Sequence, residues 1–225
     1  MGPIDCDATD LSTINETLRS LSSGASAELV NPGGRHNLAV GLERGIEVKI
    51  DGHVGYYCGG MNRGATIRVS GNTGQGVGEN MMAGEIRVDG FASAAAGASA
   101  HGGLLVVKKD VSIRCGISLK GAEIVVGGNA GNMCGFMAQL GTIIICGDTA
   151  QDLGDSLYEA VIYVGGEIAD LGADAEIQEM TESDRSKLQE LLNRAGIDRD
   201  PVSFRRVASA KELYHFDASK RQVYG

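Results

Sequence analysis

The stretch "ATIRVSGNTGQGVGENMMAGEIRVDG", residues 65–90, contains one short pattern twice. "ATIRVSG" (65–71) returns nineteen residues later as "GEIRVDG" (84–90). Related segments occur at residues 46–52, 103–109, 122–128, 141–147 and 160–166. The first six copies are spaced by 19 residues, and the last step reads as 18 when the columns are aligned. A period this constant is typical of a repeat architecture.

Aliphatic residues recur at two positions of the repeat, two residues apart, and so share one face of a strand. The first column is Val48, Ile67, Ile86, Leu105, Ile124, Ile143 and Val161, and the second is Ile50, Val69, Val88, Val107, Val126, Ile145 and Tyr163. Stacking like residues on like in every turn is what a parallel β-solenoid does. We therefore predict an all-β fold, a right-handed parallel β-helix of about seven 19-residue coils with N- and C-terminal helical caps.

The glycine-rich loop "GNTGQGVG" (71–78) follows a strand, as many phosphate-binding loops do. The dinucleotide fingerprint would need glycine where Glu79 stands, no Gly-Lys-Ser/Thr follows, and the next element is another strand. We instead assign these glycines to corners of the coil, where the backbone needs a positive φ or has no room for a Cβ. One glycine column has no exception among the seven coils: Gly59, Gly78, Gly97, Gly116, Gly135, Gly154 and Gly172.

The ends of the chain differ from the repeat and divide it into three parts. Residues 1–35 hold a short helix, with Asp10 or Ser12 as N-cap, and a lead-in. Residues 36–178 form the β-helix. Residues 179–225 hold a helix over 181–196 that ends before Gly196, then a tail rich in tyrosine and phenylalanine. We expect this tail to dock on the solenoid or on a partner.

The outward column between the two aliphatic ones changes character along the chain. It reads Lys49, Arg68, Arg87, Val106, Val125, Ile144 and Ile162. An aliphatic stripe of this kind must be covered. Either the C-terminal helix or tail covers Val106, Val125, Ile144 and Ile162 within the chain, or these four residues form a subunit interface.

Composition excludes several classes of function. The formal net charge of −9 argues against a nucleic-acid surface. No apolar run approaches the length that a membrane-spanning helix needs, which predicts a cytoplasmic protein without a membrane segment. The five cysteines lack a CxxC pair, and the histidines are scattered, so we expect no catalytic, cofactor-binding or metal-binding residues on this chain.

Two glycine-patterned segments, "GNTGQGVGENMMAGEIRVDG" (71–90) and "GGNAGNMCGFMAQLGTIIICGD" (127–148), carry a family resemblance. Together with the lead-in "HNLAVGL" (36–42), they resemble the GXGXG β-helix domain that closes the large subunit of glutamate synthase. The same domain occurs as one of the subunits of formylmethanofuran dehydrogenase. The resemblance covers roughly residues 30–180. It implies a non-catalytic scaffold that packs between an amidotransferase domain and an FMN-binding synthase barrel.

The free-standing length and the segment "PVSFRRVASAKELYHFD" (201–217) are most similar to the β-helix subunits of N-methylglutamate synthases, the methylamine–glutamate N-methyltransferases. This resemblance implies a transferase subunit of methylamine metabolism in a hetero-oligomer. Its partners would be a class II glutamine-amidotransferase-like chain and an FMN-binding glutamate-synthase-like chain. FMN and an iron–sulfur cluster would sit on a partner, with no cofactor on this chain.

Three alternatives stay open: an ammonia-using split glutamate synthase, a formylmethanofuran dehydrogenase subunit, and an independent β-helix enzyme. The sequence also departs from the family pattern at two places. Lys108, Lys109 and Asp110 replace the usual glycine after the fourth strand, and Leu140 stands where most coils have a small residue.

Overall fold

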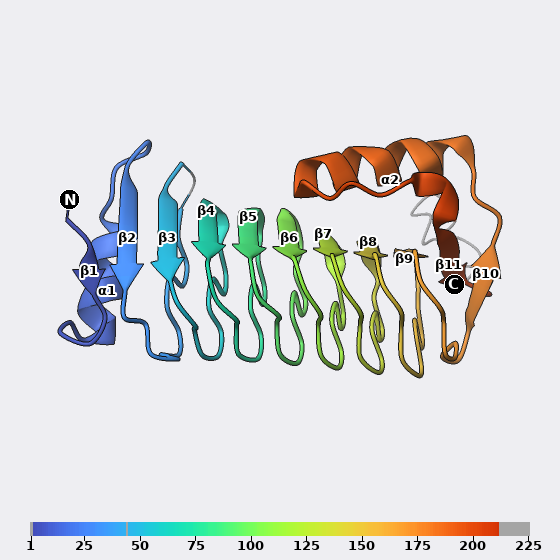
Figure 1. Cartoon of the computed structure of the whole chain (residues 1–225), viewed down its shortest axis with the longest axis horizontal. Helices are drawn as coiled ribbons and strands as arrows, with labels where there is room; N and C mark the ends of the chain where they lie inside the picture. Colours follow the sequence, from blue (N-terminus) through green and yellow to red (C-terminus); the bar gives the residue numbers. More distant parts are fainter. Residues whose placement is uncertain (1, 44, 212–225) are drawn as a thin grey trace, which may run out of the picture.

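Nine parallel strands stack in chain order along a straight rod, each lying beside the strand of the preceding coil (Figure 1). The structure is a computed structural model that describes residues 2–43 and 45–211. The nine strands are β1 (Ile4–Asp5), β2 (Ser26–Val30), β3 (Glu47–Asp51), β4 (Arg63–Val69), β5 (Ala83–Val88), β6 (Leu104–Val107), β7 (Lys120–Val126), β8 (Leu140–Ile145) and β9 (Val161–Val164). The predicted all-β parallel solenoid is confirmed.

The strand register reproduces the predicted columns from β3 to β8. Ile67 lies opposite Ile86, and each later pair in this column advances by one full repeat, up to Ile143 opposite Ile162. These side chains are fully buried. A second row of single bridges, from Val54–Thr73 to Thr149–Ile168, stacks another wall of the coil. The core is therefore one continuous column along the rod.

The last coil corrects the predicted alignment. Ile162 lies opposite Ile143 and is buried in the core, whereas Tyr163 lies opposite Ile144 on the outer face. The prediction that Ile162 belongs to the outward aliphatic column with Val106, Val125 and Ile144 is wrong, and Tyr163 takes its place. The missing residue falls later in the coil, because Thr149 still pairs with Ile168 at the full repeat spacing while Leu153 pairs with Leu171, one position short of it.

Six of the seven glycines in the uninterrupted column have left-handed backbone, with φ between +67° and +74°. They are Gly59, Gly78, Gly97, Gly116, Gly135 and Gly154. The space beside them is also occupied: a Cβ on Gly116 would lie 2.5 Å from Cδ1 of Ile143. Gly172, in the shortened coil, is not left-handed, but a Cβ there would lie 2.4 Å from Cα of Asp155.

A ladder of polar side chains links successive coils just beyond each strand. His53 Nδ1 accepts the Asn72 N–H at 2.9 Å, and Asn72 Oδ1 accepts the Phe91 N–H at 3.1 Å. Phe91 has no acceptor to offer the next coil, so the ladder stops there. It resumes with Asp110 and continues through Asn129 and Asp148 to the Glu167 N–H, at 2.7–2.8 Å. We call this set the side-chain ladder.

The interruption at Phe91 explains why Lys109 stands where the other coils have glycine. A Cβ on Gly90 would lie 2.1 Å from Asn72 Oδ1, and one on Gly128 would lie 2.3 Å from Asp110 Oδ1. The ladder oxygen of one coil thus requires glycine in the next. Lys109 occupies this position in the coil after Phe91, where no ladder oxygen fills the space. Positions 91 and 109 are therefore sterically linked: a ladder oxygen at position 91 would require glycine at position 109.

The N-terminal end is closed by α1 (Leu11–Arg19), whose Ile14 and Leu18 are buried against the first coils. Asp10 is its N-cap and accepts the Thr13 N–H at 3.0 Å. The parallel sheet begins earlier than residue 36, because β1 and β2 already stack on β3. Leu29 lies opposite Ile50, a step that is longer than one repeat and so falls outside the predicted pattern.

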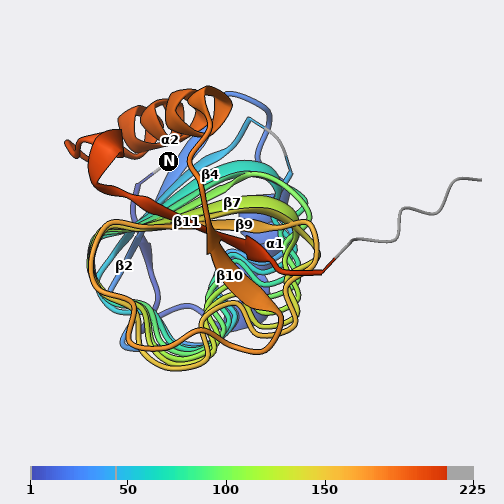
Figure 2. The same ribbon diagram turned by 90° about the vertical axis from the view of Figure 1, so that its right-hand side faces the viewer.

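The C-terminal end is closed by β10 (Ala175–Gln178) and β11 (Arg205–Ser209), with η1 (Pro201–Ser203) leading into β11. β11 inserts between β9 and β10 and runs antiparallel to both. The helix α2 (Glu182–Ala195) lies outside the coils (Figure 2). Its N-cap is Thr181, and Gly196 ends it with φ +72°. The predicted docking tail thus supplies β11 to the cap, and its residues 212–225 lie outside the described part of the chain.

The side-chain ladder yields a direct test at its first rung. Replacing His53 by alanine leaves the Asn72 N–H without its acceptor, so the free energy of unfolding should fall by about 1 kcal/mol. His53→Asn introduces the residue type used at Asn72 and Asn129 and should keep most of the stability. Urea unfolding of both variants measures this. Equal loss in the two variants would show that the imidazole stabilises the coil by packing rather than by accepting the hydrogen bond.

Candidate functional site

The outer face of the sheet divides into a charged half and an apolar half. Lys49, Arg68 and Arg87 project from β3, β4 and β5, and Lys49 and Arg68 are exposed. From β6 onward the same column reads Val106, Val125, Ile144 and Tyr163, all buried. We call these four residues the outer stripe. Its change of polarity marks where a covering element begins.

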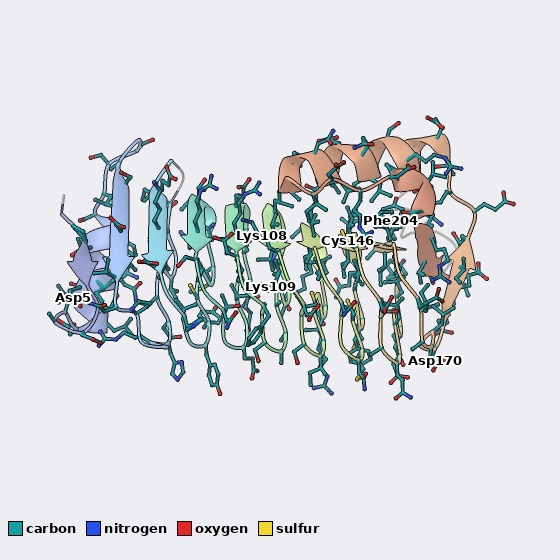
Figure 3. The ribbon with its side chains drawn as sticks, viewed as in Figure 1. Asp5, Lys108, Lys109, Cys146, Asp170 and Phe204 are labelled. Atoms are coloured by element: carbon teal, nitrogen blue, oxygen red, sulfur yellow. The ribbon has the colours of Figure 1, made fainter. Side chains whose placement is uncertain are left out.

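That covering element is α2, which runs along the rod above β6 to β9 (Figure 1). Its buried side chains recur on one helix face, as the sequence pattern predicts. They are Leu188, Leu191, Leu192 and Ala195. Together with Cys146 and Phe204 they join the outer stripe in a second apolar core (Figure 3). Of the two interpretations left open by the sequence, coverage within the chain is confirmed, and a subunit interface at the stripe is wrong.

Arg87 anchors the C-terminal end of α2 to the sheet. Its Nη1 donates to the Ala195 carbonyl oxygen at 2.9 Å, its Nη2 donates to the Arg194 carbonyl oxygen, and its Nε pairs with Glu85. A cation at a helix C-terminus satisfies carbonyls that lack intrahelical partners and stabilises the helix dipole. Arg194 adds an ion pair to Glu123 at 2.8 Å. Arg87, a member of the outward column, thus holds the C-terminal end of α2 on the sheet.

Asp184 anchors the other end of α2. Its Oδ1 accepts the Tyr163 hydroxyl at 2.6 Å and lies 3.3 Å from Arg206 Nε, while its Oδ2 accepts the Thr181 N–H at 2.8 Å. Burial opposes ionisation of this carboxyl, but the hydrogen bonds from Thr181 and Tyr163 outweigh it and lower the pKa of Asp184. Burial, followed by the neighbouring carboxylate, raises the pKa of Tyr163. The pair therefore stays as phenol and carboxylate, and its hydrogen bond holds the N-terminal end of α2 against β9.

The five cysteines are buried thiols. Burial raises the pKa of Cys58 to about 12 and that of Cys146 to about 11. A hydrogen bond with Cys115, followed by burial, raises the pKa of Cys134. Because the thiolate is the nucleophile and the metal ligand, a raised pKa lowers the reactivity of these three thiols.

Of the histidines that the structure describes, His36 and His53 accept hydrogen bonds from backbone N–H groups. His53 is the first rung of the side-chain ladder, and His36 accepts the Tyr56 N–H at 2.9 Å while its ring stacks on Tyr56. His101 is exposed, and His215 lies outside the described residues. Across residues 2–43 and 45–211, no group of three or more His, Cys, Asp or Glu side chains could hold a metal ion.

One hollow of about 300 Å³ at the C-terminal cap gathers charged and polar side chains, among them Glu159, Arg206 and Lys211. An open hollow of about 610 Å³ is lined by Met61, Arg63, Asn80, Met82 and Ala83, and its one charged side chain pairs with Glu43 at 3.2 Å. A smaller hollow of about 240 Å³ on the charged half of the sheet holds Lys49, Arg68 and Asp89 among its lining residues. Neither of these last two sets a nucleophile beside a base. Neither described helix has the length and apolarity needed to cross a bilayer.

The covered stripe makes a stability prediction. Val125→Asp or Ile144→Asp would bury a carboxylate beneath α2 without a partner, so the free energy of unfolding should fall by about 3 kcal/mol or more. Lys49→Ala, in the same column on the exposed half, should change it by less than about 0.5 kcal/mol. Urea unfolding followed by circular dichroism measures both. A Val125→Asp chain of unchanged stability would mean that α2 does not cover the stripe in solution.

The lowered pKa of Asp184 predicts a pH dependence. A carboxyl whose pKa falls on folding stabilises the folded state above its unfolded pKa, near 3.8, and this contribution disappears as the pH falls through the folded pKa. The stability difference between the wild type and Asp184→Asn should therefore be largest above about pH 5 and shrink towards about pH 3. Thermal unfolding across this range measures it. A constant difference would assign Asp184 a purely packing role.

Comparison with known proteins agrees with this geometry. The model of the GXGXG motif family matches residues 7–196, which is most of the chain. Protein GlxC of Rhizobium meliloti (strain 1021) is 48% identical over 228 aligned residues, which cover 100% of both chains. The stacked glycine columns and the two comparisons lead to one conclusion: the chain belongs to the GXGXG family.

Proposed function

We propose that this chain is a non-catalytic scaffold subunit of a glutamate-synthase-like complex, an N-methylglutamate synthase. The complex would convert methylamine and glutamate to N-methylglutamate and ammonia. This chain would pack between a class II glutamine-amidotransferase-like subunit and an FMN-binding glutamate-synthase-like subunit.

The observation that carries the proposal is a capped solenoid in which two charged side chains and the side-chain ladder hold the chain's own elements together. Arg87 and Asp184 fix α2, and the side-chain ladder holds neighbouring coils together. A scaffold needs a rigid rod with defined faces, whereas an enzyme needs converging acid, base and nucleophile. The anchored α2 and the side-chain ladder favour the first arrangement, so partner chains would supply the chemistry.

The FMN and the iron–sulfur cluster of such a complex would likewise belong to a partner. An iron–sulfur cluster is held by several converging thiolates, usually four. In this chain only Cys115 and Cys134 are in contact among the described thiols, and both are buried in the core. These residues do not fit a cluster, and we assign no step of the reaction to them.

Membership of the GXGXG family and the full-length similarity to GlxC support a relative of the glutamate-synthase β-helix domain. The methylamine substrate rests on the resemblance of the C-terminal segment 201–217 to N-methylglutamate synthase subunits.

Co-expression with the two proposed partner chains tests the function. We expect native mass spectrometry to show one complex containing all three chains. That complex should form N-methylglutamate from methylamine and glutamate, and the isolated chain should not. Preference for ammonia over methylamine would move the assignment to a split glutamate synthase. A chain that stays monomeric beside both partners, or cleaves a sugar polymer alone, would contradict the scaffold role.

A further inference from the structure

The interruption of the side-chain ladder at Phe91 places an aromatic side chain in solvent. Phe91 is 48% exposed, in a protein with only four phenylalanines. Its coil runs beside the next one: the Ala92 N–H donates to the Asp110 carbonyl oxygen at 3.1 Å, and the Ala95 N–H donates to the Ile113 carbonyl oxygen at 2.9 Å. Residues 91–95 and 109–114 therefore form one continuous surface.

This surface combines apolar and basic side chains. Ile113 is 45% exposed, and Lys109 and Arg114 are exposed as well (Lys109 is labelled in Figure 3). We define Phe91, Ala94, Lys109, Ile113 and Arg114 as the Phe91 patch. Neither Lys109 nor Arg114 forms an ion pair with any residue that the structure describes. The carboxylate next to Lys109 in the chain, Asp110, already accepts the Asn129 N–H.

At the patch the solenoid forgoes one inter-coil hydrogen bond, while about half of the Phe91 side chain stays exposed. At Phe91 the coil gives up a ladder acceptor that His53, Asn72, Asp110, Asn129 and Asp148 all supply. A local rule broken without internal compensation is expected at functional positions. Aromatic side chains, phenylalanine included, and arginine are also enriched at protein interfaces.

We propose that the Phe91 patch is a docking surface for an acidic segment of a partner chain, which would place an apolar side chain against Phe91 and Ile113. The argument for this occupant is charge: Lys109 and Arg114, which form no ion pair with a described residue, lie in the coil next to that of Phe91, on a protein whose net charge is −9. Such complementarity orients the partner, and repulsion between like charges keeps its acidic segment away from acidic surfaces elsewhere on this protein. The inference rests on the proposed function, because it names the surface by which the scaffold would hold a partner.

The test uses a variant that repairs the repeat. Phe91→Asn together with Lys109→Gly restores both the ladder acceptor and the glycine, so this double variant should unfold at a temperature equal to or above that of the wild type. Phe91→Asn alone would drive the new oxygen into the Lys109 Cβ and should be less stable. Because the double variant keeps its fold, a loss of binding can be assigned to the patch. The double variant should bind the FMN-bearing chain or the amidotransferase-like chain at least tenfold more weakly than the wild type does. Isothermal titration with each purified partner measures this.

Two controls sharpen the result. Met61→Asn replaces another exposed apolar residue by the type that Asn80 supplies in the next coil, and it should leave binding unchanged. Raising NaCl from about 50 to about 300 mM should weaken wild-type binding more than that of Lys109→Ala/Arg114→Ala, because salt screens exposed charges.

If the wild type binds and the repaired variant binds within twofold, the docking surface is wrong while the scaffold role stands. If the wild type binds neither chain, both are wrong. Loss of self-association in the repaired variant would assign the patch to a second copy and overturn the proposal.

Discussion

The backbone hydrogen bonds of the strands run between coils rather than within them, and from β3 to β9 each coil returns to the strand after the same number of residues. Ile86 can face Ile67 and Leu105 only because each coil returns to the strand after one full repeat. A one-residue slip would turn every inward side chain outward. The left-handed glycines at Gly59 and its equivalents make this constant circuit possible, since they turn the chain where a Cβ would strike the core.

The same constraint couples residues that are distant in sequence. A ladder oxygen at Asn72 or Asp110 fills the space that a side chain would need in the following coil, so Gly90 and Gly128 are required there. At Phe91 the oxygen is missing and Lys109 is tolerated. The residue at a ladder position therefore decides whether the next coil needs glycine at the position that faces it. Leu140, by contrast, is half exposed, and nothing in the structure explains its departure.

The sequence predicted the elements that repeat and missed those that do not. The constant period identified the inner columns because each coil presents the same apolar pair. It failed at β9, where the shortened coil made Tyr163 look inward, although the residue is lost only between Ile168 and Leu171. It missed β1 and β2, because the longer step from β2 to β3 carries no repeat signal. The helix α2 was visible from its caps and apolar spacing. Its place over the outer stripe depended on long-range partners such as Arg87, which no local pattern identifies.

A solenoid offers a scaffold something that a compact domain does not. Each coil contacts only its neighbours, so a local change is felt one coil away and the rest of the rod is preserved. Equivalent positions on one face recur at about 4.8 Å. One column can therefore hold a helix clamp at Arg87 and a covered apolar core at Val125, while Lys49 stays open to solvent. The side chains of single coils can therefore differ while the stack keeps the spacing between coils fixed. For that reason the coils that break the repeat without an internal cause are the places where partners are expected to bind.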